Sequence, residues 1–299
     1  MMPPSTKRRS YFDPLVLAKI STMSLRARHV VEGLLSGLHE SPYRGYSVEF
    51  AEHREYAPGD EIRRIDWKAY GKFDRYFVKE YEEETNLKAY LLLDASASMD
   101  YGSQGVSKFD YGCYLAVSLA YLMLRQGDHV GLVTFGAQVQ RYIPPRSGMK
   151  HMHALTGHLE ATRPHGETHL DHVLRDIAGK LTKRGMVVVI SDLFDTPETV
   201  MRALQYFRHR RNEVMVFHLL DHNELEFPFD RLTVFEDIED ANLRVLSEPR
   251  TIRQAYTQQI QSFIDEYRRA CRRELIDYNL FPTTTPLDIA LTRYLARRQ

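Results

Sequence analysis

Apolar runs alternate with amphipathic stretches along most of the chain from Lys88 onward. Nearly continuous apolar content predicts strands that are covered on both faces: Ala89–Leu93, His129–Phe135, Met186–Ser191 and Glu213–Leu219. Apolar positions at helical spacing predict helices between and after them: Phe109–Arg125, Met149–Glu160, Leu170–Arg184 and Pro197–His209. Strands that alternate with helices in this way indicate an α/β fold with a mainly parallel sheet flanked by helices.

The last part of the chain predicts shorter elements. Leu232–Ser247 is interpreted as two short strands around a turn at Glu239–Asn242. Apolar residues at helical spacing then predict a long helix from about Thr251 to Tyr278. Thr285-Pro286 combines an N-cap residue with a proline at the first helical position, so a further helix is expected toward Arg297.

Residues before 88 have a different pattern. The segment from Phe12 to about Leu38 is helix-like, whereas Tyr46–Tyr56 and Arg75–Tyr81 alternate as strands do around a turn at Pro58-Gly59-Asp60. We therefore expect an N-terminal α+β extension, residues 1–88, followed by the α/β domain, residues 89–299.

The composition favours a cytoplasmic protein. Basic and acidic residues balance at 40 each, so no bulk field attracts nucleic acid. No apolar run reaches the roughly 18–20 residues that a membrane-spanning helix needs, and the N-terminus lacks the apolar core of a signal peptide. Cys113 and Cys271 lie in helix-like stretches without CxxC spacing, which suggests neither a disulfide framework nor a thiolate metal site.

The most distinctive chemistry follows the first strand of the α/β domain. Asp94, Ser96 and Ser98 come directly after Leu91–Leu93, and alternate residues of an extended loop point the same way. Ligands of open α/β sheets bind at the carboxyl ends of the strands. Carboxylate and hydroxyl oxygens favour a hard ion such as Mg²⁺. An ordinary serine-rich turn after a strand is the alternative.

Two later features add oxygen donors. Thr168 lies in the loop before the Leu170 helix, and Asp192 ends the strand Met186–Ser191. If the strands that end in Asp94 and Asp192 are neighbours, both carboxylates lie at the same edge of the sheet.

These motifs resemble the metal-ion-dependent adhesion site of von Willebrand factor A domains. The resemblance implies a Rossmann-like, von Willebrand factor A-like fold in which Ser96, Ser98 and Thr168 ligate Mg²⁺, with Mn²⁺ or Ca²⁺ as alternatives. Asp94 and Asp192 would bind the ion directly or through water. Such a site would hold the carboxylate of an acidic partner in the ion's open position. Two further carboxylates lie close in sequence and could assist from a greater distance: Asp100 and Asp195.

A second resemblance covers the N-terminal part. The run from Tyr56 through Pro58-Gly59-Asp60, Arg63 and Ile65-Asp66-Trp67 to Val78–Glu82 is similar to a bacterial domain-of-unknown-function family whose genes accompany MoxR-type AAA+ ATPases. Together with the von Willebrand-like region, the resemblance spans about Gly45 to Leu219.

Two roles stay open for this N-terminal run. It could be a structural cap that packs on the main sheet through Trp67, or it could contact the ATPase. Arg63, Asp66 and Trp67 are the candidate partner-binding residues, with Arg64 and Lys68 as further candidates for the ATPase contact.

Histidines cluster in the middle of the chain: His151, His153, His158, His165, His169 and His172. Their spacing does not match the His-Glu-x-x-His pattern of zinc proteases, and no cysteine partner accompanies them. We therefore expect surface or loop histidines, with His169 placed to influence the pH response of the Mg²⁺ site.

The sequence favours a non-enzymatic, Mg²⁺-dependent interaction protein. By resemblance, its partners would be a MoxR-type AAA+ ATPase and a client in chaperone-like assembly or maturation of protein complexes. The chain has no Gly-x-x-x-x-Gly-Lys-Ser/Thr motif, so it is not expected to hydrolyse ATP. The alternatives are a metal-dependent, phosphatase-like hydrolase, against which no neighbouring Lys or Arg is evidently placed for a phosphoryl group, and extracellular adhesion.

Overall fold

The computed structural model describes residues 48–55, 70, 76–83, 87–181, 183–236, 238 and 244–285. They belong to two compact units, of which one ends at Asn86 and the other contains Leu87 and the residues that follow. The first holds an antiparallel hairpin of β1 (Val48–Glu55) and β2 (Phe77–Glu83), with an irregularity in register between Phe50 and Glu52. The predicted pair of alternating strands is therefore confirmed.

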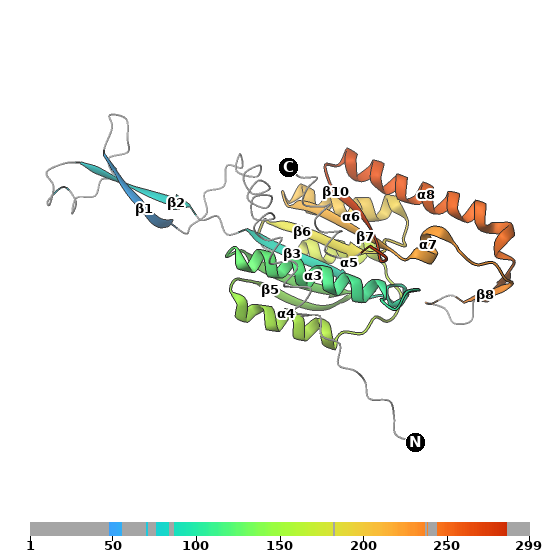
Figure 1. The fold of residues 1–299 in the computed structure, drawn as a ribbon. Helices are drawn as coiled ribbons and strands as arrows, with labels where there is room; N and C mark the ends of the chain where they lie inside the picture. Colours follow the sequence, from blue (N-terminus) through green and yellow to red (C-terminus); the bar gives the residue numbers. More distant parts are fainter. Residues whose placement is uncertain are drawn as a thin grey trace, which may run out of the picture. The chain divides into compact units, whose positions relative to one another are not determined.

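The second unit is built on a six-stranded sheet (Figure 1). In spatial order its strands are β10 (Asp277–Pro282), β7 (Glu213–Leu220), β6 (Met186–Ser191), β3 (Lys88–Asp94), β4 (His129–Phe135) and β5 (Val139–Arg146). The pairings are parallel except that of β4 with β5, which is antiparallel. The predicted α/β class with a mainly parallel sheet is confirmed, including the four strands predicted in this unit's sheet.

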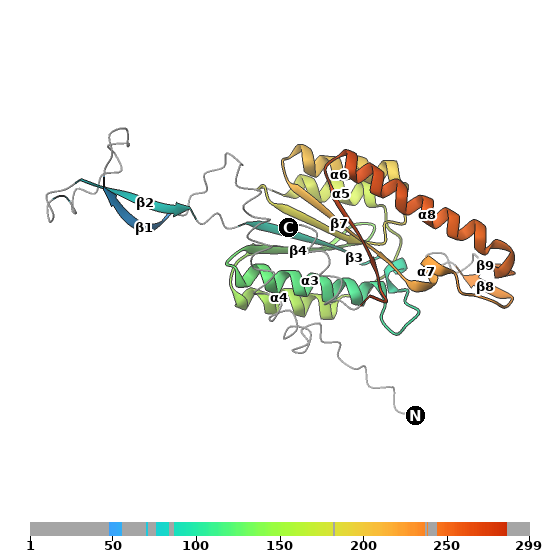
Figure 2. The same cartoon turned by 45° about the horizontal axis from the view of Figure 1, so that its top comes forward.

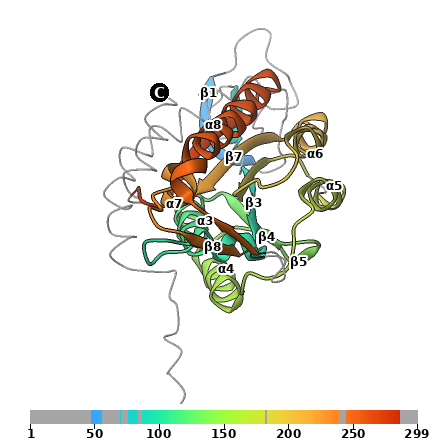
Figure 3. The same cartoon turned by 90° about the vertical axis from the view of Figure 1, so that its right-hand side faces the viewer.

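Helices cover both faces of the sheet (Figures 2 and 3). One face carries α3 (Lys108–Arg125) and α4 (Met149–Ala161). The other face carries α5 (Leu170–Lys180), α6 (Pro197–His209) and α8 (Pro249–Arg273). A 3₁₀ helix, η2 (Ala97–Asp100), follows β3, and the short helix α7 (His222–Glu226) follows β7.

Alternation along β3 explains the two separate cores. Leu91 and Leu93 are buried among residues of α3 and α4, whereas Tyr90 and Leu92 are buried among residues of α5 and α6. Such a strand must be apolar throughout, which is why its sequence is a continuous run. Gly112 brings α3 close to the sheet, because a Cβ at this position would lie 2.8 Å from Leu93 Cδ1.

The end of the long helix was predicted wrongly. Helix α8 ends at Arg273 instead of continuing to Tyr278. The amide of Ile276 donates to Cys271 O at 2.9 Å, and Leu275 adopts a left-handed φ of 54°, so the helix closes in a Schellman motif. The chain then forms β10, whose pairing with β7 the helical pattern did not indicate.

Two other boundaries differ from the sequence pattern. Helix α5 ends at Lys180, short of the predicted Arg184. Strand β5 was not predicted, since it contains Pro144 and Pro145, which are tolerated on an edge strand. The two short strands expected in Leu232–Ser247 are confirmed as β8 (Thr233–Glu236) and β9 (Arg244–Ser247). The expected helix at Phe12–Leu38, the Pro58-Gly59-Asp60 turn and the helix after Thr285 lie outside the described residues.

Candidate functional site

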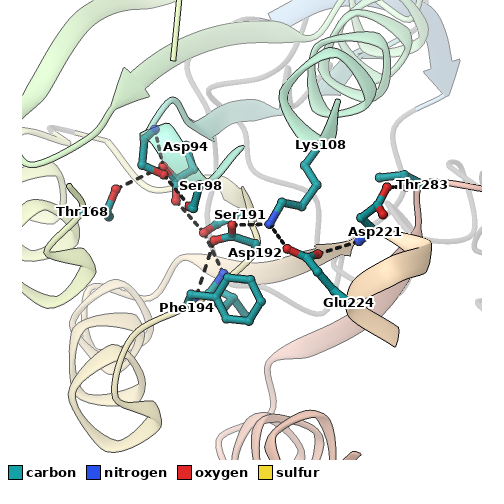
Figure 4. A network of polar contacts seen from close by, with 12 residues as sticks. Asp94, Ser98, Lys108, Thr168, Ser191, Asp192, Phe194, Asp221, Glu224 and Thr283 are labelled. Atoms are coloured by element: carbon teal, nitrogen blue, oxygen red, sulfur yellow. Dashed lines mark hydrogen bonds and ion pairs between the residues drawn. The ribbon is translucent and has the colours of Figure 1, made fainter. Parts of the chain in front are cut away.

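The strands that end in the two predicted carboxylates are direct neighbours. β3 pairs with β6 in parallel, with Leu93 opposite Ile190, so Asp94 and Asp192 lie at the same carboxyl edge of the sheet (Figure 4). Each is almost fully buried, with exposed fractions of 1% and 2%. The proximity that the sequence could only suggest is therefore present in the fold.

Asp94 is the centre of a hydrogen-bonded group. Its Oδ1 accepts from the amide of Ser96 at 2.9 Å and from Thr168 Oγ1 at 3.4 Å. Its Oδ2 accepts from Ser191 Oγ at 2.7 Å. Ser96 Oγ and Ser98 Oγ lie 3.1 Å apart. Four of the five predicted ligands, Asp94, Ser96, Ser98 and Thr168, are thus joined in one group.

Backbone hydrogen bonds tie the Thr168 loop to the serine loop. The amide of Ala97 donates to Gly166 O at 2.8 Å, and that of His165 donates to Ala95 O at 3.0 Å. Gly166 has a φ of 73°, a left-handed conformation that glycine adopts without steric cost. The second loop is therefore held beside the first by the main chain, and this contact places Thr168 near Asp94.

Asp192, the fifth predicted ligand, has different partners. Its Oδ2 accepts from Lys108 Nζ at 2.7 Å, and its Oδ1 accepts from the amide of Phe194 at 3.4 Å. Lys108 Nζ also donates to Glu224 Oε1 at 2.5 Å. Asp192 therefore lies beside the Asp94 group as half of a buried ion pair (Figure 4).

The electrostatics of the site follow from burial. Burial, and then repulsion from Asp192, raises the pKa of Asp94 to about 6, against the opposing effect of its hydrogen bonds. Burial lowers the pKa of Lys108, but the attraction of Asp192 and Glu224 outweighs it, so that the pKa is raised. The edge of the sheet thus gathers negative charge around the buried ammonium group of Lys108.

The donor set at this edge fits a hard divalent cation. Asp94 supplies a buried carboxylate whose hydrogen bonds do not fully offset the cost of burying its negative charge. Ser96, Ser98 and Thr168 add neutral hydroxyl oxygens. Among the described residues, no group of three or more His, Cys, Asp or Glu side chains could hold a metal ion. A cation held at this edge would therefore need hydroxyl oxygens as well as carboxylates.

Sequence reasoning missed three polar side chains of this region: Ser191, Lys108 and Glu224. Lys108 contacts Asp192, but its ammonium is buried and bonded to two carboxylates, so its presence does not alter the expectation that no neighbouring Lys or Arg is placed for a phosphoryl group. Lys108 begins α3, and Glu224 lies 116 residues further along. A lysine at the first position of an apolar helix is the one local signal, because its ammonium must find a buried partner.

The nearby alternative carboxylates are used differently. Asp195 Oδ2 accepts from the amide of Leu170 at 3.0 Å and Oδ1 from that of Thr196, so Asp195 holds the start of α5 next to Thr168. Asp100 is exposed on η2. Arg63, Asp66 and Trp67, the predicted partner-binding residues, lie outside the described residues, as do Arg64 and Lys68.

The histidine prediction was right for four residues and wrong for two. His153, His165, His169 and His172 are exposed. His151 is buried and its Nε2 lies 2.8 Å from Val130 O, while half-buried His158 bonds Thr134 Oγ1 at 2.8 Å through Nε2. Both lie on the face of α4 that packs against the sheet, where the ring fills core space and its nitrogen satisfies a buried acceptor or hydroxyl.

Comparison with known families identifies the chain. A family model described as "Protein of unknown function DUF58" matches residues 52–263, which include part of β1, all of β2 and the candidate site. The chain belongs to the DUF58 family. The predicted membership of a domain-of-unknown-function family is therefore confirmed.

Relatives of this DUF58 chain are found in Mycobacterium tuberculosis and Bacillus subtilis. It is 31% identical over 250 residues to the protein Rv1480 of Mycobacterium tuberculosis, covering 82% of this chain and 78% of that protein. It is 26% identical over 169 residues to YeaD of Bacillus subtilis, covering 56% of this chain and 39% of YeaD.

Solved structures similar to this DUF58 chain include BatB from Bacteroides thetaiotaomicron, at 14% identity and a TM-score of 0.48, covering 71% of this chain and 98% of that one. They also include the SpRpn10 VWA domain, at 13% identity and a TM-score of 0.39, covering 70% and 95%. Neither similarity carries information about function. None of the helices in the described part of the chain has the length and apolar character to cross a membrane.

Proposed function

We propose that this DUF58 chain is a Mg²⁺-dependent protein-interaction module. One observation carries the proposal: the buried carboxylate of Asp94 lies within hydrogen-bonding distance of Thr168 and beside the hydroxyls of Ser96 and Ser98, at the carboxyl edge of the sheet. Ser96, Ser98 and Thr168 would hold the ion through their hydroxyls, and Asp94 and Asp192 would hold it directly or through water.

The charge of the site supports an acidic partner. Of the two predicted carboxylate ligands, Asp192 shares the ammonium of Lys108 with Glu224, so it would offset a bound ion less than Asp94 does. The ion would therefore keep positive charge toward solvent, and a glutamate or aspartate of a partner would complete its coordination. Binding of this kind needs no bond-breaking step, and the proposal is of a non-enzymatic role.

The partners proposed are a MoxR-type AAA+ ATPase and an acidic client, in chaperone-like assembly or maturation of protein complexes in the cytoplasm. This part rests on the resemblance of the N-terminal run around Arg63, Asp66 and Trp67 and on membership of the DUF58 family. Co-purification from native lysate, with and without a chelator, tests it. An ATPase retained equally in both conditions would contradict the role of the metal.

Calorimetric titration of Mg²⁺ into the full chain tests the metal site. Asp94→Asn should abolish binding, since the variant loses the buried charge that offsets the ion. Asp176→Asn is the control, because Asp176 is an exposed carboxylate of α5 that pairs with Lys180, and its loss should leave Mg²⁺ affinity unchanged. Equal affinity of Asp94→Asn and wild type would refute the proposed site.

A phosphatase-like reaction receives less support. Lys108, the cation that contacts Asp192, is 0% exposed and bonds two carboxylates, so it does not face a site where a phosphoryl group could bind. Mg²⁺-dependent hydrolysis of a generic phosphoester, lost in Asp94→Asn, would instead favour the enzymatic function.

A further inference from the structure

Lys108 connects the candidate metal site to α7. Its Nζ lies 2.7 Å from Asp192 Oδ2 and 2.5 Å from Glu224 Oε1 (Figure 4). Asp192 directly follows β6, whereas Glu224 lies in α7, where its other oxygen accepts from the amide of Asp221 at 2.7 Å. One ammonium group is therefore shared between a predicted metal ligand and a residue of the α7 capping box.

The position of Lys108 is fixed by its surroundings. Its side chain is 1% exposed, and its Nζ lies 4.7 Å from the ring centroid of Phe194. Ser107 caps α3 by accepting from the amide of Asp110, and Gly112 allows this helix to approach β3 closely. A buried ammonium that is held this way has no alternative partner in solvent, so both ion pairs persist in the folded protein.

An ammonium and a divalent cation compete for the same carboxylate. Asp192 Oδ2 is occupied by Lys108, while Oδ1 makes only a 3.4 Å contact with the amide of Phe194. A positive charge close to a cation site also repels the incoming ion, and more strongly in a buried environment than in water. Lys108 therefore opposes cation binding through Asp192.

We infer that Lys108 is a positioning residue that restrains the Asp192 carboxylate and offsets its charge, so that the site binds its cation weakly and leaves it electron-poor. The inference rests on the proposed Mg²⁺ site and specifies how its affinity is set. An ion held by one uncompensated carboxylate keeps more of its charge for an acidic partner than an ion held by two. Glu224 weakens the opposition of Lys108 to cation binding, because its carboxylate partly neutralises the ammonium charge.

Calorimetry with Mg²⁺ alone provides the test. Lys108→Met should bind Mg²⁺ about tenfold more tightly than wild type, because Asp192 is released and a repelling charge is removed. The same variant should melt at a lower temperature without metal, since Asp192 and Glu224 lose their partner, and should gain more from added Mg²⁺ than wild type does. A merely structural lysine would lower the melting temperature without tightening Mg²⁺ binding, and that result would overturn the inference.

Glu224→Gln provides a second variant that does not depend on the folding of Lys108→Met. Glutamine can still close the α7 capping box, but it no longer shares the charge of Lys108. Mg²⁺ affinity should fall about threefold, since the ammonium then acts on Asp192 alone. An unchanged or higher affinity would contradict the inference.

Action through Asp192 is separated from direct repulsion by a double variant. With Asp192→Asn as background, Lys108→Met should tighten Mg²⁺ binding by less than about threefold, because the carboxylate to be released is gone. A full tenfold gain in this background would overturn the positioning role. Lys180→Met is the matched control: Lys180 pairs with Asp176 on the exposed side of α5, and its loss should leave affinity unchanged.

The proposed metal site and the role of Lys108 are refuted by different results. Wild type that binds no Mg²⁺, or binds it independently of Asp94, refutes the proposed function itself. Wild type that binds Mg²⁺ through Asp94, with Lys108→Met no tighter, refutes only the role of Lys108.

Discussion

Ser191 Oγ donates to Asp94 Oδ2 at 2.7 Å, across 97 residues of sequence. The contact joins the last residue of β6 to the last residue of β3, and both side chains are buried. The same hydroxyl accepts from the amide of Leu193 at 3.0 Å. Ser191 thus fixes the carboxylate at the centre of the candidate site and the first turn of the loop beyond it.

Ser191→Ala is predicted to lower the free energy of unfolding by about 2 kcal/mol, because a buried carboxylate oxygen loses its donor. Urea unfolding at neutral pH measures the change. Ser118→Ala is the matched control: Ser118 is also fully buried, but its hydroxyl donates to Tyr114 O within α3. Equal losses in the two variants would show that Ser191 stabilises no more than an ordinary helix serine does.

Leu275→Gly is predicted to stabilise the protein by about 1 kcal/mol, because glycine adopts the left-handed conformation without strain. Leu275 has a φ of 54° in the turn that ends α8, and its side chain is 76% exposed, so little packing is lost. Thermal unfolding measures the gain. Leu275→Ala, which keeps a Cβ, should not reproduce it, and equal stabilisation by alanine would contradict the conformational explanation.

Asp128 makes stability depend on pH. Burial raises its pKa to about 6, only partly opposed by the bond from the amide of Leu87, whereas an exposed aspartate titrates near 3.8. The folded protein therefore holds this proton more tightly than the unfolded chain does. The resulting contribution to stability is complete below pH 3.8 and is lost as pH rises through about 6.

Asp128→Asn should consequently raise the free energy of unfolding by about 1–2 kcal/mol at pH 7.5 and leave it unchanged near pH 3.5. Denaturant unfolding at the two pH values measures the difference. The exposed Asp176, which pairs with Lys180, supplies the control Asp176→Asn, for which no gain is expected at pH 7.5. A gain from Asp128→Asn that is equal at both pH values would exclude titration of this carboxyl as the cause.

Tyr267→Phe is predicted to loosen the loop after β6. The buried hydroxyl of Tyr267 donates to Leu193 O at 3.1 Å and to Asp195 O at 3.4 Å, and Leu193 itself has a left-handed φ of 55°. Without these bonds, stability should fall by about 1–2 kcal/mol, and amides of residues 193–196 should exchange hydrogen faster.

Tyr206→Phe is the control for this prediction, because Tyr206 is 48% exposed on α6. Its substitution should change neither stability nor exchange. Slower or unchanged exchange at residues 193–196 in Tyr267→Phe would mean that the loop is held by other contacts.

The sequence by itself determined the elements whose burial is uniform. Strands β3, β4, β6 and β7 are continuous apolar runs because both of their faces are covered, and that pattern is visible without the fold. The spacing of Asp94, Ser96 and Ser98 is equally local, although the extended loop expected for these residues was wrong: Ser98 lies in the 3₁₀ helix η2, which begins directly after Ser96. Local spacing was therefore enough to place three oxygen donors at the end of a strand.

Only the tertiary structure decided which distant groups meet them. Strand order brings Ser191 to Asp94, and helix packing brings Lys108 to Asp192 and Glu224 over separations of 84 and 116 residues. Strand β10 likewise exists because α8 closes at Leu275 and leaves the chain beside β7. The periodicity of apolar residues indicates which positions are buried. Which residues far apart in sequence become partners depends on the order of the strands and on how closely the helices pack against them, and no local pattern encodes either.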